Sequence, residues 1–197
     1  QVLRDCDVCS EYYLESIPEV ASGINLKNAF TFEFFFSSGA LDRTGMGTWK
    51  EDLSSDNKKM VVLNSDPGKK NPLSLVNSSR KKGRQTTVKM IDINPSLSSY
   101  FLAVGFIEND TVYTYCDQQG EAVLDGETFD SLQVMFEFCP DHMLSIPSTK
   151  NNNYFQVKSD ETLFEIFFRG FQLSVNEEGL AGNHPVLKGN YQYLKSN

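Results

Sequence analysis

The sequence predicts an all-β protein, and three observations support that class. Polar and apolar residues alternate with a period of two along many short segments, as they do in half-buried strands. The 197 residues include 15 Phe and eight Tyr, and aromatic residues favour the pleated surface of a sheet. Only residues 10–20 carry a pattern that allows a helix, of a turn or two before Pro18.

The N-terminal part of the chain contains the clearest predicted strand, over residues 29–37. Phe30, Phe32, Phe34 and Phe36 occupy alternate positions there, so all four rings are expected on one face, in the core. Residues 37–45 are expected to form a turn-rich connection. Further strands are predicted over 47–52, 60–64 and 73–76, with turns or loops over 54–59, 65–72 and 77–84.

The remaining sequence continues as short strands. Residues 99–107 form a nearly continuous apolar run, which is typical of a strand buried on both faces. The polar segment 148–153 is the best linker candidate in this part. The other strands are expected over 85–95, 112–116, 121–124, 131–138, 154–158, 163–168, 171–175 and 191–194.

The middle of the chain, residues 86–139, resembles a known family of β-sandwiches. Residues 86–92 (TTVKMID), the apolar strand at 101–107 (FLAVGFI) and residues 112–124 (VYTYCDQQGEAVL) are similar to transthyretin-like, carboxypeptidase-regulatory-like domains. The likeness includes a turn that ends in Gly120 and a short strand after it. The resemblance implies a sandwich that serves as an accessory or adhesive module without catalytic residues.

The flanking segments resemble small lipocalin-like barrel proteins exported by bacteria. The residues that carry the likeness are 30–36 (FTFEFFF), Gly47 with Trp49, and 60–64 (MVVLN). This resemblance implies a small antiparallel barrel.

These observations combine into one predicted architecture. Residues 1–84 and 151–197 are expected to form a lipocalin-like antiparallel barrel of roughly eight strands. Residues 85–150 are expected to form an inserted immunoglobulin-like or transthyretin-like sandwich. Closure of the barrel would leave no open sheet edge. Two sandwiches in series are the alternative.

Basic residues gather in one stretch of an otherwise acidic chain. The formal net charge is −8 and the isoelectric point is about 4.8, which argues against nucleic-acid binding. Successive loops of a meander alternate between its two ends, so the loops at 54–59 and 77–84 are expected to share an end. Together they would form a basic rim that holds an anionic polysaccharide, a phosphate group or a lipid head group. The residues of this rim are Lys58, Lys59, Arg80, Lys81, Lys82 and Arg84.

The four cysteines are expected in disulfides, because an even count fits an oxidising compartment. The favoured pairs are Cys6–Cys9, as a local loop, and Cys116–Cys139, as a clip across the inserted segment. A redox-active CxxC at residues 6–9 and a zinc site built from all four cysteines are the alternatives.

The sequence lacks the familiar catalytic and cofactor motifs, including the GxSxG elbow, HExxH, the P-loop and GxGxxG after a strand. Cys139, Asp141 and His142 are close together in the chain, and the preferred interpretation is a loop after a strand. His184 is expected in a surface turn. We therefore expect no catalytic residue, no cofactor and no metal ion.

The function predicted from the sequence is binding without catalysis, outside the cytoplasm. No apolar run approaches the roughly 20 residues needed to span a bilayer. The chain starts at Gln1, which fits removal of a signal peptide. We expect an exported protein, periplasmic or at the cell surface, that contacts an anionic polysaccharide or another envelope component. A small cysteine-dependent hydrolase or redox protein, and a lipocalin-like carrier of a small apolar ligand, are the alternatives.

Overall fold

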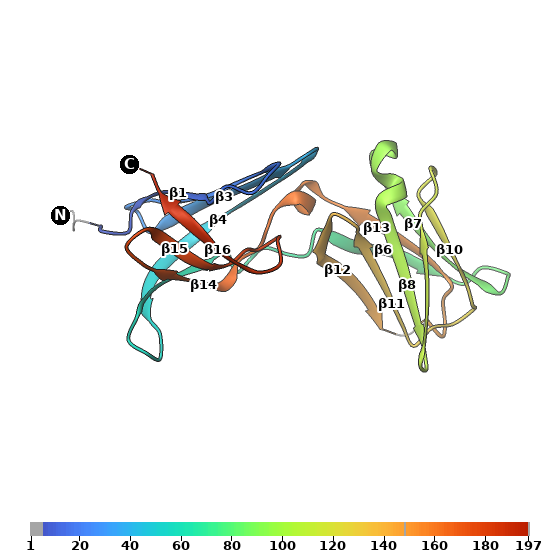
Figure 1. The fold of residues 1–197 in the computed structure, drawn as a ribbon. Helices are drawn as coiled ribbons and strands as arrows, with labels where there is room; N and C mark the ends of the chain where they lie inside the picture. Colours follow the sequence, from blue (N-terminus) through green and yellow to red (C-terminus); the bar gives the residue numbers. More distant parts are fainter. Residues whose placement is uncertain (1–5, 148, 197) are drawn as a thin grey trace. The chain divides into compact units, whose positions relative to one another are not determined.

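The chain folds into two compact units, each made almost entirely of β-strands (Figure 1). The computed structural model describes residues 6–147 and 149–196, so Gln1 lies outside the described residues. One unit comprises the described residues up to Lys69 and from Phe164 onward, and the other comprises residues 70–163. The second unit, drawn from green to orange, is therefore an insertion into the first.

The first unit is a closed barrel in which every strand pairs antiparallel with its two neighbours. Strands β1 to β5 follow one another as a meander, β14 pairs with β5, and β16 closes the ring against β1. The insertion therefore fills one hairpin connection, between β5 and β14. The barrel strands are β1 (Ser10–Leu14), β2 (Val20–Leu26), β3 (Thr31–Ser38), β4 (Leu41–Leu53), β5 (Lys59–Asn64), β14 (Arg169–Val175), β15 (Gly179–Asn183) and β16 (Asn190–Lys195).

Aromatic side chains fill the barrel. Phe32 and Phe34 both pack edge-on against Phe168, with ring centroids 5.1 and 5.4 Å from the Phe168 centroid. Trp49 is buried, and its indole N–H donates to the carbonyl of Lys27 at 3.1 Å. The buried core consists of Val8, Tyr12, Ile24, Leu26, Phe32, Phe34, Phe36, Trp49, Val61, Leu63, Ile166, Phe168, Leu173, Leu180 and Tyr193.

Phe30 departs from the predicted row of four core phenylalanines. It lies in the turn before β3, with a φ of 58°, and 58% of its surface is exposed. Its ring packs over Trp49, with 5.1 Å between the ring centroids. The prediction was wrong for this residue because the strand begins only at Thr31, after the turn has rotated Phe30 outward.

The inserted unit consists of two four-stranded sheets, in the orders β10-β7-β13-β6 and β12-β11-β8-β9. Alternate residues are buried, as Val88 and Met90 of β7 and Leu132 and Val134 of β11 show, so each sheet has one buried face. The elements are β6 (Leu73–Ser79), β7 (Gln85–Ile91), η1 (Pro95–Tyr100), β8 (Phe101–Ile107), β9 (Asp110–Tyr115), β10 (Glu121–Asp125), β11 (Ser131–Phe136), β12 (Cys139–Pro147), β13 (Tyr154–Ser159) and η2 (Glu161–Phe164), whose last residue belongs to the barrel unit. The predicted all-β class, a barrel with a sandwich, is confirmed.

The insertion is longer at both ends than the predicted 85–150. Strands β6 and β13 were expected in the barrel, but they pair antiparallel with each other, and β13 pairs in parallel with β7. Alternation identifies a strand but not its partner, and so the sequence placed these two strands in the wrong sheet. Of the predicted linker, Ser148 lies outside the described residues. Thr149 is tied to the insertion by its backbone N–H, which donates to the carbonyl of Phe129 at 2.9 Å.

Three other segments differ from what their local pattern indicated. Residues 10–14 form β1 rather than a helix, because both β2 and β16 supply hydrogen bonds to this segment. Residues 41–45 belong to β4 and not to a long turn. Residues 163–168 are not a strand: η2 ends at Phe164, and two later side chains of the segment, Ile166 and Phe168, enter the barrel core.

Candidate functional site

The structure divides the predicted basic rim between the two units. Lys58 and Lys59 lie where β4 turns into β5, in the barrel. The other four residues lie in the connection from β6 to β7, in the insertion. The prediction that both loops belong to one meander was wrong, because β6 leaves the barrel and pairs with β13. What stays together is one exposed segment, called the basic loop here, with the cations Arg80, Lys81, Lys82 and Arg84.

A buried asparagine holds both ends of the basic loop. Asn153 is only 2% exposed. Its Oδ1 accepts the backbone N–H of Lys81 at 2.7 Å, and its Nδ2 donates to the carbonyl of Gln85 at 3.0 Å. Its backbone N–H donates to the carbonyl of Ser79 at 3.1 Å. Gly83 adopts a φ of 134°, which other residues rarely adopt. These contacts hold the backbone at Lys81 and at both ends of the loop in the absence of a ligand.

Two of the four cations in the basic loop contact other residues of the inserted unit. Arg80 forms an ion pair with Glu127. The Nζ atom of Lys81 lies 3.1 Å from the centroid of the Tyr154 ring, a cation–π contact. Lys82 and Arg84 are exposed and form no ion pair with any described residue. These two side chains are therefore the ones most available to an anion.

The arrangement can hold an anionic group with little loss of backbone freedom. Because Asn153 already holds the backbone of the loop at Lys81 and at both ends, less backbone freedom is lost on binding, and this improves affinity. The Arg84 guanidinium can also donate two parallel hydrogen bonds to one phosphate, sulfate or carboxylate. The sequence did not reveal Asn153 or Tyr154 as part of this site. Their only distinguishing feature in the sequence is that Asn153 directly precedes β13 and Tyr154 is its first residue.

The structure confirms one of the two predicted disulfides. Cys6 and Cys9 are joined, with 2.01 Å between their sulfur atoms. Cys116 and Cys139 are buried and are not in a disulfide. The predicted bond between them was wrong because Cys116 follows β9 and Cys139 begins β12, the two outer strands of one sheet. Two strands lie between, so the thiols stand roughly 14 Å apart at about 4.8 Å per strand, far beyond disulfide reach.

Cys139 and His142, which are close together in the chain, do not form an accessible site. Cys139 has 0% exposure and His142 has 4%; both lie on β12 rather than in the expected loop. The Nε2 atom of His142 is 3.7 Å from Oδ2 of Asp141. Burial raises the pKa of the Cys116 thiol to about 12, so it is not a thiolate at neutral pH. A substrate could not reach either sulfur without opening the sandwich.

His184 is buried inside the barrel, although a surface turn was expected. Its Nδ1 accepts the backbone N–H groups of Val186 at 3.0 Å and Leu187 at 2.9 Å. Nδ1 therefore carries no proton, and Nε2 donates to Oγ of Ser22 at 3.1 Å. The Ser22 hydroxyl in turn donates to the carbonyl of Phe35 at 2.8 Å. His184 is thus a neutral, structural residue.

The thiols provide a direct test of the cysteine-dependent alternative. We expect a thiol reagent such as Ellman's reagent to react slowly with the native protein, because Cys116 and Cys139 are buried. After denaturation without reductant, it should find two thiols, since the Cys6–Cys9 disulfide does not react. Rapid modification of a thiol in the native state would contradict this prediction.

No family model, curated protein or solved structure matches this chain. The resemblances of residues 86–139 and of the barrel segments to known families therefore stay predictions. No helix within the described ranges is long and apolar enough to cross a membrane. Across the same ranges, the His, Cys, Asp and Glu side chains form no group of three or more that could hold a metal ion.

Proposed function

We propose that the protein is an exported, non-enzymatic binding protein that contacts anionic groups of an envelope glycan or lipid through the basic loop. The observation that carries this proposal is the concentration of four cations in residues 80–84, on a loop anchored by the buried side chain of Asn153. Sulfate, phosphate and carboxylate groups share the chemistry that Lys82 and Arg84 would recognise.

The Cys6–Cys9 disulfide supports export, because disulfides persist in oxidising compartments and are rare in the cytosol. The two alternatives have less support. A cysteine-dependent enzyme needs an accessible thiolate, and both remaining thiols are buried. A carrier of an apolar ligand needs space inside the barrel, where Phe32, Phe34 and Phe168 pack against one another.

The proposal is tested by reversing the two exposed charges in the double variant Lys82→Glu and Arg84→Glu. The wild-type protein is expected to bind immobilised heparin or vesicles that contain phosphatidylglycerol, and to be released as salt is raised. The variant should bind roughly tenfold more weakly, because the change replaces attraction by repulsion, and neither residue takes part in the Arg80–Glu127 and Lys81–Tyr154 contacts. Preferential binding to heparin would identify a glycan as the source of the anion, and preferential binding to the vesicles would identify a lipid.

The matched control is Lys58→Glu with Lys59→Glu, which makes the same change in net charge on the barrel. We expect this control to bind like the wild type. Equal losses in the two double variants would contradict the assignment to the basic loop, since net charge alone would then explain the binding. No binding of the wild-type protein to either probe at low salt would also overturn the proposal.

A further inference from the structure

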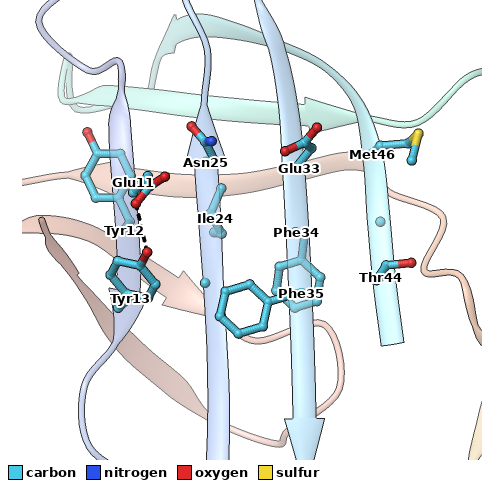
Figure 2. Close-up of a pocket in the computed structure, with 12 residues that line it drawn as sticks. Glu11, Tyr12, Tyr13, Ile24, Asn25, Glu33, Phe34, Phe35, Thr44 and Met46 are labelled. Atoms are coloured by element: carbon cyan, nitrogen blue, oxygen red, sulfur yellow. Dashed lines mark hydrogen bonds between the residues drawn. The ribbon is translucent and has the colours of Figure 1, made fainter. Parts of the chain in front are cut away.

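A second candidate site lies on the outer face of the barrel, over β1 to β4 (Figure 2). It is a hollow of about 420 Å³, which is within the usual range of about 300–1,000 Å³ for small-molecule sites. We call it the outer groove. The side chains that face it are Glu11, Tyr13, Asn25, Glu33, Phe35 and Thr44, with Met46 at one end.

Two rings form the apolar part of the outer groove. Tyr13 and Phe35 lie on the two sides of β2, with their ring centroids 6.4 Å apart and their planes at 61°. They are 45% and 39% exposed. Gly23, between them in the register, makes this arrangement possible: a Cβ atom there would come within 2.7 Å of the Phe35 ring. The groove therefore offers two ring surfaces that meet at an angle.

A polar row runs beside the rings. Glu11, Asn25 and Glu33 are register partners on β1, β2 and β3, and Figure 2 shows them side by side. The Tyr13 hydroxyl donates to Oε2 of Glu11 at 2.8 Å, and Glu33 forms an ion pair with Lys27. The row thus presents hydrogen-bond donors and acceptors, while its two carboxylates already have partners.

The outer groove continues into a neighbouring hollow of about 550 Å³. The two hollows share Glu33 and Met46. The second is lined by the hydroxyl groups of Thr31 and Thr48, the carboxylate of Asp66, and two lysines that form ion pairs, Lys27 with Glu33 and Lys69 with Glu165. Two adjoining hollows favour a ligand made of several linked units over a single small molecule.

We propose that the outer groove binds a neutral oligosaccharide. Sugar rings have apolar C–H faces that fit aromatic surfaces such as Tyr13 and Phe35, and hydroxyl groups that both donate and accept. A purely apolar ligand would bury the polar row without hydrogen bonds, at a cost. Glu33 is paired with the cation Lys27, whereas Glu11 accepts a hydrogen bond from the neutral Tyr13 hydroxyl and keeps its negative charge. This one exposed charge disfavours an anionic ligand and attracts a cation only weakly.

The test is calorimetric titration of the 197-residue chain with hexasaccharides of glucose, mannose, xylose and N-acetylglucosamine. We expect saturable binding of at least one of them, and roughly tenfold weaker binding in Tyr13→Ala and in Phe35→Ala. Phe35→Leu serves as a second variant that keeps an apolar side chain and removes the ring. The matched control is Tyr113→Ala, which removes a 67% exposed tyrosine from the inserted unit and should leave binding unchanged.

Three results would overturn the proposal: no saturable binding of any of the four sugars, binding that neither ring variant weakens, or tighter binding of hexalysine than of every sugar. The groove and the basic loop share no residue and belong to different units. The Lys82→Glu, Arg84→Glu variant should therefore retain sugar binding while it loses binding to heparin or vesicles.

Discussion

Phe34→Ala is expected to lower the free energy of unfolding by about 3–5 kcal/mol. The Phe34 side chain is 3% exposed in the barrel core. Its ring centroid lies 5.4 Å from that of Phe168 and 5.8 Å from that of His184. Truncation would leave a cavity among these rings that a closed barrel can only partly fill. Denaturant unfolding followed by the fluorescence of Trp49, the only tryptophan in the chain and part of the same core, measures the loss.

The matched control is the adjacent residue of the same strand, in Phe35→Ala. Phe35 points outward and is 39% exposed, so its truncation should cost about 1 kcal/mol or less. The two variants delete the same side chain from opposite faces of β3. Similar losses of stability in both would contradict the core assignment that follows from the alternation of this strand.

The second large effect is a dependence of stability on pH that arises from His184. Burial lowers the pKa of His184 from 6.5 to about 4. Between these two values the unfolded chain binds a proton that the folded protein does not, so stability is highest above pH 6.5 and falls as the pH drops toward 4. The loss over this window is about 3 kcal/mol. The groups packed around the imidazole are Ser22, Phe34, Phe36, Tyr191 and Tyr193.

The variant His184→Asn isolates this contribution. The Asn side-chain oxygen can accept the backbone N–H groups that Nδ1 accepts in the wild type, but the side chain does not take up a proton. The variant should be less stable than the wild type at pH 8, where the imidazole packing is lost. Its stability should also fall less between pH 6.5 and 4, as urea unfolding at each pH would show. An unchanged slope would mean that other groups cause the acid sensitivity.

The parts of the fold that were predictable are those with a strong local pattern. Residues 31–36 alternate so regularly that β3 and its core face follow from the order of the side chains. The assembly of one barrel from an N-terminal and a C-terminal segment was also predictable, because alternating strands occur in both segments and the sequence pattern between them is different. The disulfide at Cys6–Cys9 needed only the proximity of the two residues in the chain.

The parts that were not predictable depend on contacts between distant residues. Arg43 is 2% exposed, and its guanidinium donates to the backbone carbonyls of Phe164 at 3.4 Å and Glu165 at 3.2 Å. The residues next to Arg43 in the chain do not indicate that its charged side chain is buried inside the barrel. His184 is similar, since its turn-like surroundings give no sign of the rings that enclose it.

Each of the two candidate sites also has features that the sequence predicts and features that only the tertiary structure reveals. The charges of residues 80–84 are evident in the chain, but their place in a different unit from Lys58 and Lys59 follows from the pairing of β6 with β13. The outer groove has no sequence motif, because Glu11, Asn25 and Glu33 become neighbours only through the register of β1, β2 and β3. Side-chain order fixes which residues can form strands and which face each side chain takes. Strand partners and register depend on long-range hydrogen bonds and core packing, and in this protein those contacts assemble both the basic loop and the outer groove.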